Sequence, residues 1–289
     1  MKALATSPMS LCAALDELAA ATWLEIEQGR RTRHPLDEEA ITSYHLMRLA
    51  AAVSSIRLEK HTKQRESKSG ADWEIWVGRS GALIGLRVQA KILRLENSGP
   101  QYKALYSSKT KATVQVDKLI ASAEAARPRM YPAVVFYNSL PRAPADFRSV
   151  DCSRLDGAPL LCGWTVMSAY ALRDQLLVSP TKYLRDLVDR MLPLSCIFCC
   201  QASCPMSLES PGPLAERVAT QIDHAWNRDA IDVRGLVGPG PAYVERLYRG
   251  ESAETGWTFL PPAFRRVFTD GRNIPKGVVA FSSFAITTH

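Results

Sequence analysis

Long apolar runs, repeats and several common catalytic patterns are missing from this chain. No run of 18 uncharged apolar residues occurs among its 289 residues, so a membrane-spanning helix is not expected. The Gly-x-Ser-x-Gly turn of serine hydrolases and the phosphate-binding loop of nucleotide hydrolases are also absent, which argues against those two chemistries. The five histidines show no metal-ligand spacing. Without internal repeats or low-complexity tracts, the chain is expected to be globular.

Cysteine usage and the N-terminal segment indicate a reducing compartment. The first residues make a poor signal peptide, because Pro8, Asp16 and Glu17 interrupt the apolar stretch. The seven cysteines are an odd number in a large chain, which favours free thiols over a disulfide framework. We therefore expect a cytoplasmic protein that does not associate with membranes.

What the sequence does contain is enough apolar material for a substantial core. Hydrophobic residues make up 46% and charged residues 22%, which is typical of folded domains. The net charge of +7 suits a phosphate-rich partner, although many unrelated proteins share such an excess. The length allows one large domain or two small ones. We expect a first domain over residues 1–205 and an extension over residues 206–289 packed on it.

Apolar periodicity predicts helices around a short run of strands. A helix is expected over 11–27, ending at the Gly29-Arg30-Arg31 segment, and a second one opens near Pro35 with the acids that follow. Strands are expected at 54–63, 71–77, 82–93 and 131–137, a turn at 64–70, a loop at 97–111 and a helix at 114–126. Weaker patterns indicate a loop at 140–154, strands at 160–164 and 278–286, and helices at 168–177, 183–191 and 214–226. The order predicts an α/β fold with a mixed sheet covered by helices.

Acidic, amide and lysine side chains fall at one end of the predicted hairpin. Asp72 opens one strand, and Gln89 and Lys91 lie near the end of the next. Residues two apart in a strand share a face, so Gln89 and Lys91 point the same way. Asp72 and the Gln89 oxygen could hold a divalent cation beside a phosphodiester, and Lys91 could orient or help deprotonate water.

A hard cation favours a second carboxylate, for which several glutamates compete. The helix after Pro35 offers Glu38 and Glu39. We favour Glu39, because Glu38 could equally serve as a first-turn charge that complements the helix dipole. Glu66 and Glu74 are rivals, and Glu74 shares a strand face with Asp72. An ordinary surface ion pair between Asp72 and Lys91 is the alternative interpretation.

These residues resemble the motif of the PD-(D/E)xK, or restriction-endonuclease-like, nuclease superfamily. The matching pieces are Gly-Ala-Asp-Trp at 70–73, Gln-Ala-Lys at 89–91 and the α-β-β-β-α-β order around them. The resemblance to uncharacterised bacterial relatives adds Glu66, Gly-Ala-Asp-Trp-Glu at 70–74, Val-Gln-Ala-Lys at 88–91, Gln-Val-Asp-Lys-Leu at 115–119 and Val-Val-Phe-Tyr-Asn at 134–138. The resemblance covers roughly residues 36–140 and fades by about 200. Gln89 stands where many members have Glu or Asp, and glutamine also occurs there in active branches.

The resemblance implies a core of α-β-β-β-α-β order and a nuclease that requires Mg²⁺ or Mn²⁺. The chain is similar to uncharacterised bacterial relatives linked to phage defence. This similarity implies nucleic acid as the partner, with DNA in preference to RNA. It also allows a homo-oligomer or a partner protein from a defence system. The implied site is Asp72, Gln89, Lys91 and Glu39, with Glu66 and Glu74 as further metal ligands. The alternative function is a catalytically inactive nuclease fold that binds nucleic acid or a protein.

A cysteine cluster forms a second, separate signal. Cys196, Cys199, Cys200 and Cys204 could bind Zn²⁺, with Cys152 and Cys162 completing a site in space. No second pair of closely spaced cysteines lies nearby, so we favour buried structural thiols instead.

Overall fold

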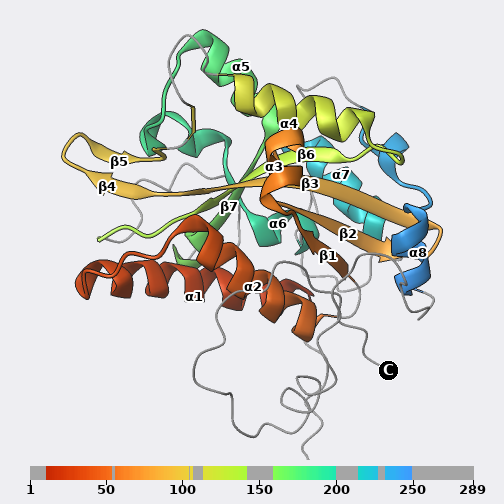
Figure 1. Cartoon of the computed structure of the whole chain (residues 1–289), viewed down its shortest axis with the longest axis horizontal. Coiled ribbons are helices and arrows are strands. Elements are labelled where there is room, and N and C mark those ends of the chain that lie inside the picture. The colour runs from red at the N-terminus through yellow and green to blue at the C-terminus, as the bar shows by residue number, and fades with distance from the viewer. Residues whose placement is uncertain are drawn as a thin grey trace, which may run out of the picture.

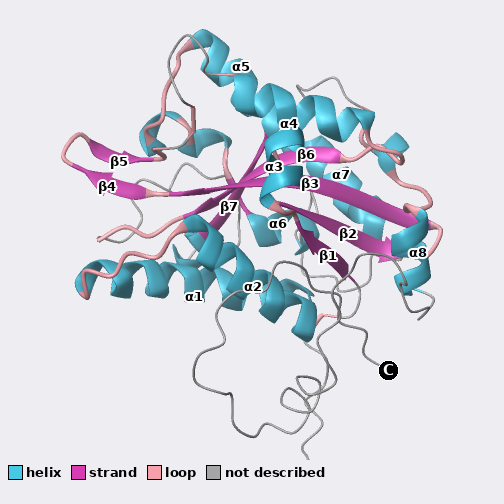
Figure 2. Cartoon of the chain, viewed as in Figure 1, coloured by secondary structure: helices cyan, strands magenta, loops and turns pink. Residues whose placement is uncertain are grey.

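The computed structural model describes residues 11–53, 56–103, 105–106, 113–141, 159–199, 214–226 and 232–248 (Figures 1 and 2). Its helices are α1 (Leu11–Arg31), α2 (Glu38–Ala52), α3 (Lys63–Ser69), α4 (Val114–Ala125), α5 (Ala169–Val178), α6 (Leu194–Cys199), α7 (Leu214–Trp226) and α8 (Ala242–Tyr248). Its strands are β1 (Ile56–Lys60), β2 (Trp73–Arg79), β3 (Ala82–Ile92), β4 (Arg94–Glu96), β5 (Gly99–Gln101), β6 (Tyr131–Tyr137), β7 (Trp164–Ser168) and β8 (Leu192–Pro193).

A six-stranded mixed sheet with the order β1-β2-β3-β6-β7-β8 organises the chain. β1, β2 and β3 form an antiparallel meander, and β6 pairs in parallel with β3 after the crossover through α4. β7 and β8 extend the sheet in antiparallel fashion. Helices lie on both sides of this sheet in Figure 1. The α/β fold with a mixed sheet flanked by helices is therefore confirmed.

Strand alternation divides the core between the two faces of the sheet. Tyr131, Ala133 and Val135 of β6 join the cluster formed with α1, α2, α6 and α7. Val134 and Phe136 join the opposite cluster, formed with α4 and α5. Successive strand residues point to opposite faces, so β6 is buried on both. This explains why its sequence is apolar throughout.

Two predictions near the N-terminal end of the chain are wrong in their local structure. α1 continues through Gly29 to Arg31. The following segment passes close over Gly29, where a Cβ would lie 2.8 Å from the His34 carbonyl oxygen. Residues 64–70, predicted as a turn, form most of α3. Thr62 accepts a hydrogen bond from the Arg65 amide and caps the helix, and Gly70 ends it with a φ of 69°.

Further differences concern short segments. The predicted loop after β3 contains the hairpin β4–β5, in which Gly99 adopts a positive φ of 113°. Residues 159–163, most of a predicted strand, form a 3-10 turn ahead of β7, and the predicted helix at 183–191 is two 3-10 turns. The predicted strand at 278–286 and most of the predicted loop at 140–154 lie outside the described residues.

Candidate active site

Asp72 and the end of β3 are joined through backbone and side-chain hydrogen bonds. The register pairs Trp73 with Val88, which brings Asp72 beside the segment that holds Gln89 and Lys91. The Asp72 amide donates to the Val88 carbonyl at 2.8 Å. Asp72 Oδ2 accepts from the Ala90 amide at 2.6 Å. The predicted juxtaposition of these residues at one end of the hairpin is therefore present.

Lys91 lies in the interior, where a glutamate from α2 reaches it. The lysine is only 4% exposed, and its Nζ atom is 3.8 Å from Glu38 Oε1. Glu38 Oε2 accepts a hydrogen bond from the Ile92 amide at 3.0 Å. Glu38 thus contacts both the side chain and the backbone of the same strand end. The Lys91 ammonium group is therefore largely buried and pairs with the Glu38 carboxylate.

The start of α2 explains why Glu38, and not Glu39, occupies this position. Asp37 caps the helix by accepting the Ala40 amide at 2.6 Å, so Glu38 is the first helical residue. Ile41 and Thr42, three and four residues later, are buried, and residues at those spacings share a helix face. Glu38 therefore lies on the face that meets the sheet.

Glu39 pairs with lysines of β1 and α3, and none of its described contacts is with Asp72 or Lys91, contrary to the sequence-based choice. Its side chain is 52% exposed and pairs with Lys63 Nζ at 2.9 Å and Lys60 Nζ at 3.4 Å. The same helical spacing that directs Glu38 to the sheet turns Glu39 toward solvent and α3. The apolar pattern of the helix already contained this signal, because Glu38 is three residues before Ile41.

Gln89 and Glu66 frame the same site. Gln89 is 2% exposed, and its Nε2 group donates to the Gly70 carbonyl at 3.0 Å, which leaves the amide oxygen as an acceptor. Glu66 of α3 is 30% exposed and pairs with Lys63 at 3.3 Å. Its negative charge contributes to the raised pKa of both Glu38 and Asp72, so it lies at the rim of the site.

Burial and mutual repulsion change the acidity of the carboxylates. Burial, together with the negative charges of Asp72 and Glu66, raises the pKa of Glu38 to about 7, although Lys91 and the Ile92 amide oppose this change. Burial also raises the pKa of Asp72, against the hydrogen bond from Ala90 and the charge of Lys91. The site therefore concentrates negative charge, which a cation would neutralise.

Glu74, a proposed rival ligand, is instead fully engaged elsewhere. Its side chain is 1% exposed. Oε1 accepts from His61 Nε2 at 2.9 Å, Arg65 Nη2 at 3.0 Å and Arg87 Nη2 at 2.7 Å, and Oε2 faces the Tyr243 hydroxyl at 3.4 Å. Burial alone would raise the pKa of Glu74, but the His61 hydrogen bond and the arginine charges outweigh it and hold the pKa at about 2. The Glu74 carboxylate therefore binds the cationic side chains around it.

His61 links that ionic network to the Asp72 turn. Its Nδ1 atom lies 3.0 Å from the Ala71 carbonyl oxygen, and its backbone amide donates to the Asp72 carbonyl at 2.7 Å. Its Nε2 atom faces the Glu74 carboxylate. The Ser69 hydroxyl also lies 3.2 Å from Nδ1, so the imidazole contacts both the end of α3 and the Glu74 carboxylate. The sequence offered no spacing signal for this residue.

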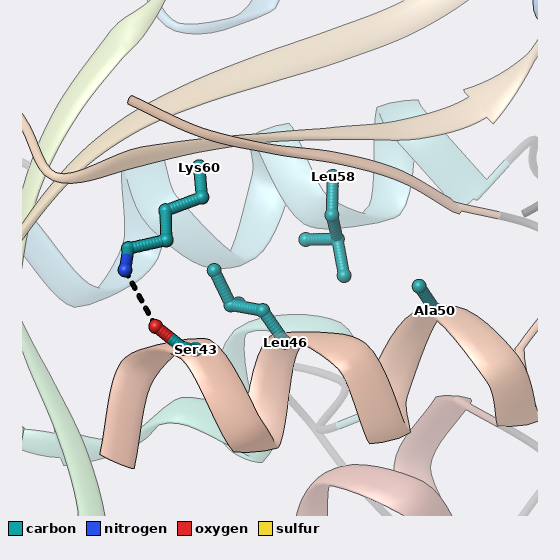
Figure 3. A pocket seen from close by; sticks show the side chains of 5 residues that line it. All are labelled: Ser43, Leu46, Ala50, Leu58 and Lys60. Carbon is teal, nitrogen blue, oxygen red and sulfur yellow. Dashed lines mark hydrogen bonds between the residues drawn. The ribbon is translucent and has the colours of Figure 1, made fainter. Parts of the chain in front are cut away.

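A small pocket between α2 and β1 lies apart from these side chains. Ser43, Leu46, Ala50, Leu58 and Lys60 line it (Figure 3). Lys60 donates to Ser43 across the pocket, and the remaining wall is apolar. None of Asp72, Gln89 and Lys91 contributes to it, so we assign it no chemical role.

A disulfide links two helices that lie far apart in the sequence. Cys12 of α1 and Cys199 of α6 are joined, with Cα atoms 5.7 Å apart. The expectation of free thiols is therefore wrong for this pair, because the two helices bring them together across 187 residues of sequence. It is also wrong for Cys196, which is disulfide-bonded. Cys162 is a buried free thiol, and burial raises its pKa to about 12. The remaining members of the predicted cluster, Cys200 and Cys204, and also Cys152, lie outside the described residues.

The donor set at the site is two carboxylates and an amide oxygen. Within the described ranges, no three acidic, histidine or cysteine side chains form a group that could hold a metal ion. No helix in these ranges is both long and apolar enough to cross a bilayer.

The fold and the site together define an α/β protein with a carboxylate–amide–lysine cluster at one end of a β-hairpin. The chain belongs to a family of unknown function, DUF6615, whose model matches residues 11–284. No curated protein shows significant sequence similarity to it.

Proposed function

We propose that this protein is a metal-dependent nuclease that hydrolyses phosphodiester bonds, with DNA as the preferred substrate. The observation that carries the proposal is the convergence of Asp72, Glu38, Gln89 and Lys91 on one strand end. Two carboxylates beside a buried lysine suit a reaction in which a negatively charged phosphate must be held and a water molecule positioned.

The residues present suit a hard divalent cation. Mg²⁺ commonly takes one or two carboxylates and keeps several waters, so a cluster of three protein acids is not required. Asp72 and Glu38 would hold the ion, with the Gln89 oxygen available as a neutral donor. When bound, Mg²⁺ or Mn²⁺ would offset phosphate charge and acidify water. Lys91 would orient the attacking water and neutralise charge that develops on the phosphate.

Cleavage of plasmid DNA tests this proposal. We expect the purified chain to nick or cut plasmid with Mg²⁺ or Mn²⁺ and to lose activity with EDTA. Asp72→Asn and Lys91→Ala should abolish cleavage, whereas Asp117→Asn, on an exposed position of α4, should retain it. Full activity of the Asp72 or Lys91 variant would exclude the assigned site. Parallel reactions with RNA test the preference for DNA.

A second candidate function is nucleic-acid or protein binding without cleavage. It is favoured by the short donor set and by the use of the Gln89 amide group on Gly70. Binding without metal-dependent cleavage on any DNA or RNA substrate would support it.

The cellular role that accompanies the nuclease proposal is that of an anti-phage effector. Its test is the plating efficiency of phage on bacteria that express the chain or its Asp72→Asn variant. Equal plating on both would contradict a defence role that depends on cleavage.

A further inference from the structure

Two arginines near the candidate active site are bound only to neutral groups. Arg30, in the last turn of α1, donates from Nη1 to the Ser139 carbonyl at 2.9 Å and from Nη2 to Ser139 Oγ at 2.7 Å. Arg94, at the start of β4, donates from Nη2 to the Leu36 carbonyl at 3.0 Å. Neither guanidinium forms an ion pair with a carboxylate within the ranges that the structure describes.

Backbone contacts bring the two arginines to the same place. A Cβ on Gly29, next to Arg30, would lie 3.4 Å from the Leu36 amide nitrogen, so the end of α1 adjoins the carbonyl that Arg94 contacts. The Leu93 amide donates to the Tyr137 carbonyl at 2.9 Å, which holds the start of β4 beside the segment leading to Ser139. Three segments distant in sequence therefore converge around two guanidinium groups.

Arg30 and Arg94 are close enough for the charge of one to affect the other. Burial lowers the pKa of Arg30, and the positive charge of Arg94 lowers it further, while Glu27 opposes the change. Glu27 itself pairs with Arg31 at 2.6 Å. A guanidinium has five N–H donors, and the contacts described use two of them on Arg30 and one on Arg94. The unused donors fit the oxygen atoms of a phosphate, which arginine recognises well.

The position of the pair relates it to the reacting site. Arg94 follows Lys91 by three residues, or roughly 10 Å along an extended chain. Leu36 precedes Glu38 by two residues. We propose that Arg30 and Arg94 bind a backbone phosphate of the nucleic acid, close to the phosphodiester held at Asp72 and Lys91. This assignment rests on the proposed function, because it takes nucleic acid as the ligand.

Arginines near a helix end can also serve only to bond its terminal carbonyls and complement the dipole. That structural role predicts a loss of stability on substitution, with no change in the salt dependence of binding. A phosphate contact instead predicts that substitution changes the salt dependence of binding, because each contact releases counterions from the nucleic acid. The two roles are therefore separable by a measurement of binding against salt.

The experiment uses the full chain with Asp72→Asn, so that binding is measured without cleavage. Fluorescence anisotropy with labelled duplex and single-stranded DNA across a salt series gives the slope of log K against log salt. Arg30→Gln and Arg94→Gln should each weaken binding and reduce the slope by about 0.7–0.9. Arg31→Gln is the matched control, because Arg31 adjoins Arg30, is 71% exposed and already pairs with Glu27.

Arg30→Lys keeps the positive charge and should keep most of the slope, even if the loss of its paired bonds to Ser139 lowers the melting temperature. Unchanged slopes in folded Arg30→Gln and Arg94→Gln variants would overturn the assignment, as would an equal change in Arg31→Gln. If the protein with Asp72 intact cleaves nothing but the slopes fall as expected, the phosphate site stands and the nuclease proposal fails. If the protein cleaves DNA but the slopes stay unchanged, the nuclease proposal stands and the phosphate site fails.

Discussion

Adjacent glutamates at the start of α2 occupy unlike environments, and this difference can be tested at the level of single residues. Glu38 bonds to the Ile92 amide and faces Lys91, whereas Glu39 pairs with exposed lysines. We expect Glu38→Gln to reduce cleavage on the order of 10²-fold, because it removes a charged group at the reacting site. Glu39→Gln should stay within about 2-fold in plasmid cleavage rate. The reverse ranking would restore the sequence-based choice of Glu39.

The acidity of Glu38 makes a further prediction about stability and pH. Its pKa rises from 4.5 to about 7 on folding, so between these values the folded chain binds more protons than the unfolded chain. The contribution of Glu38 to the free energy of unfolding is therefore fully present below about pH 4.5 and is lost as the pH rises through about 7. This change in pKa corresponds to a change of about 3 kcal/mol at most in the free energy of unfolding.

Denaturant unfolding of the wild type and Glu38→Gln at pH 5 and pH 8 measures this effect. Glutamine cannot ionise, so the variant should gain stability relative to the wild type at pH 8 more than at pH 5. An equal difference at both pH values would mean that Glu38 is not perturbed. Saturating Mg²⁺ should reduce the gain if Glu38 holds the ion, because ligation stabilises the ionised carboxylate.

How far the sequence predicted the site depends on the kind of information each residue required. Asp72, Gln89 and Lys91 could be placed together because strand pairing and alternation are local and regular. The second carboxylate required the phase of α2, which is set by Asp37 as the N-cap. His61 could not be found, because its contacts depend on the turn after α3 folding back against β1 and β2.

Among the elements, α3 differs most from its sequence pattern and shows why periodicity missed it. Its residues, Lys-Gln-Arg-Glu-Ser-Lys-Ser, contain no apolar stripe. The helix is held by its caps and by Arg65, which bonds to Glu59 of β1 and Glu74 of β2. A helix stabilised by tertiary ion pairs is not visible in a pattern that reads only apolar spacing. The longer elements, which have apolar faces, were predicted at their positions, although α1 extends beyond its predicted end.

Glu74 is the point at which several elements meet, so its loss should destabilise them together. It accepts from the segment after β1, from α3 and from β3. Glu74→Gln removes the charge that balances buried cations, and we expect a loss of about 3–5 kcal/mol in the free energy of unfolding. Glu17→Gln is the control, since its pair with Arg48 is exposed and should contribute less than about 1 kcal/mol. Guanidinium denaturation measures both, and similar small losses would contradict a structural role for the network.

At the scale of the whole molecule, the Cys12–Cys199 disulfide ties the first described helix to α6. It closes a loop of 187 residues and restricts the unfolded chain. Cys12→Ser should therefore lower the stability of the oxidised protein by about 2–5 kcal/mol. The measurement is thermal or denaturant unfolding with and without a thiol reductant. The reductant should destabilise the wild type more than Cys12→Ser, and identical curves for all four samples would count against the bond.

The two outer strands of the sheet have a consequence for aggregation. β8 has two residues, one of them Pro193, which has no amide hydrogen to donate. β1 has five residues, of which Arg57, Glu59 and Lys60 are charged, and the Arg57 guanidinium stacks 4.3 Å from the Tyr248 ring. Short, charged or proline-containing edges are poor templates for the addition of a foreign strand. A concentrated solution of this protein should therefore resist edge-to-edge fibril growth.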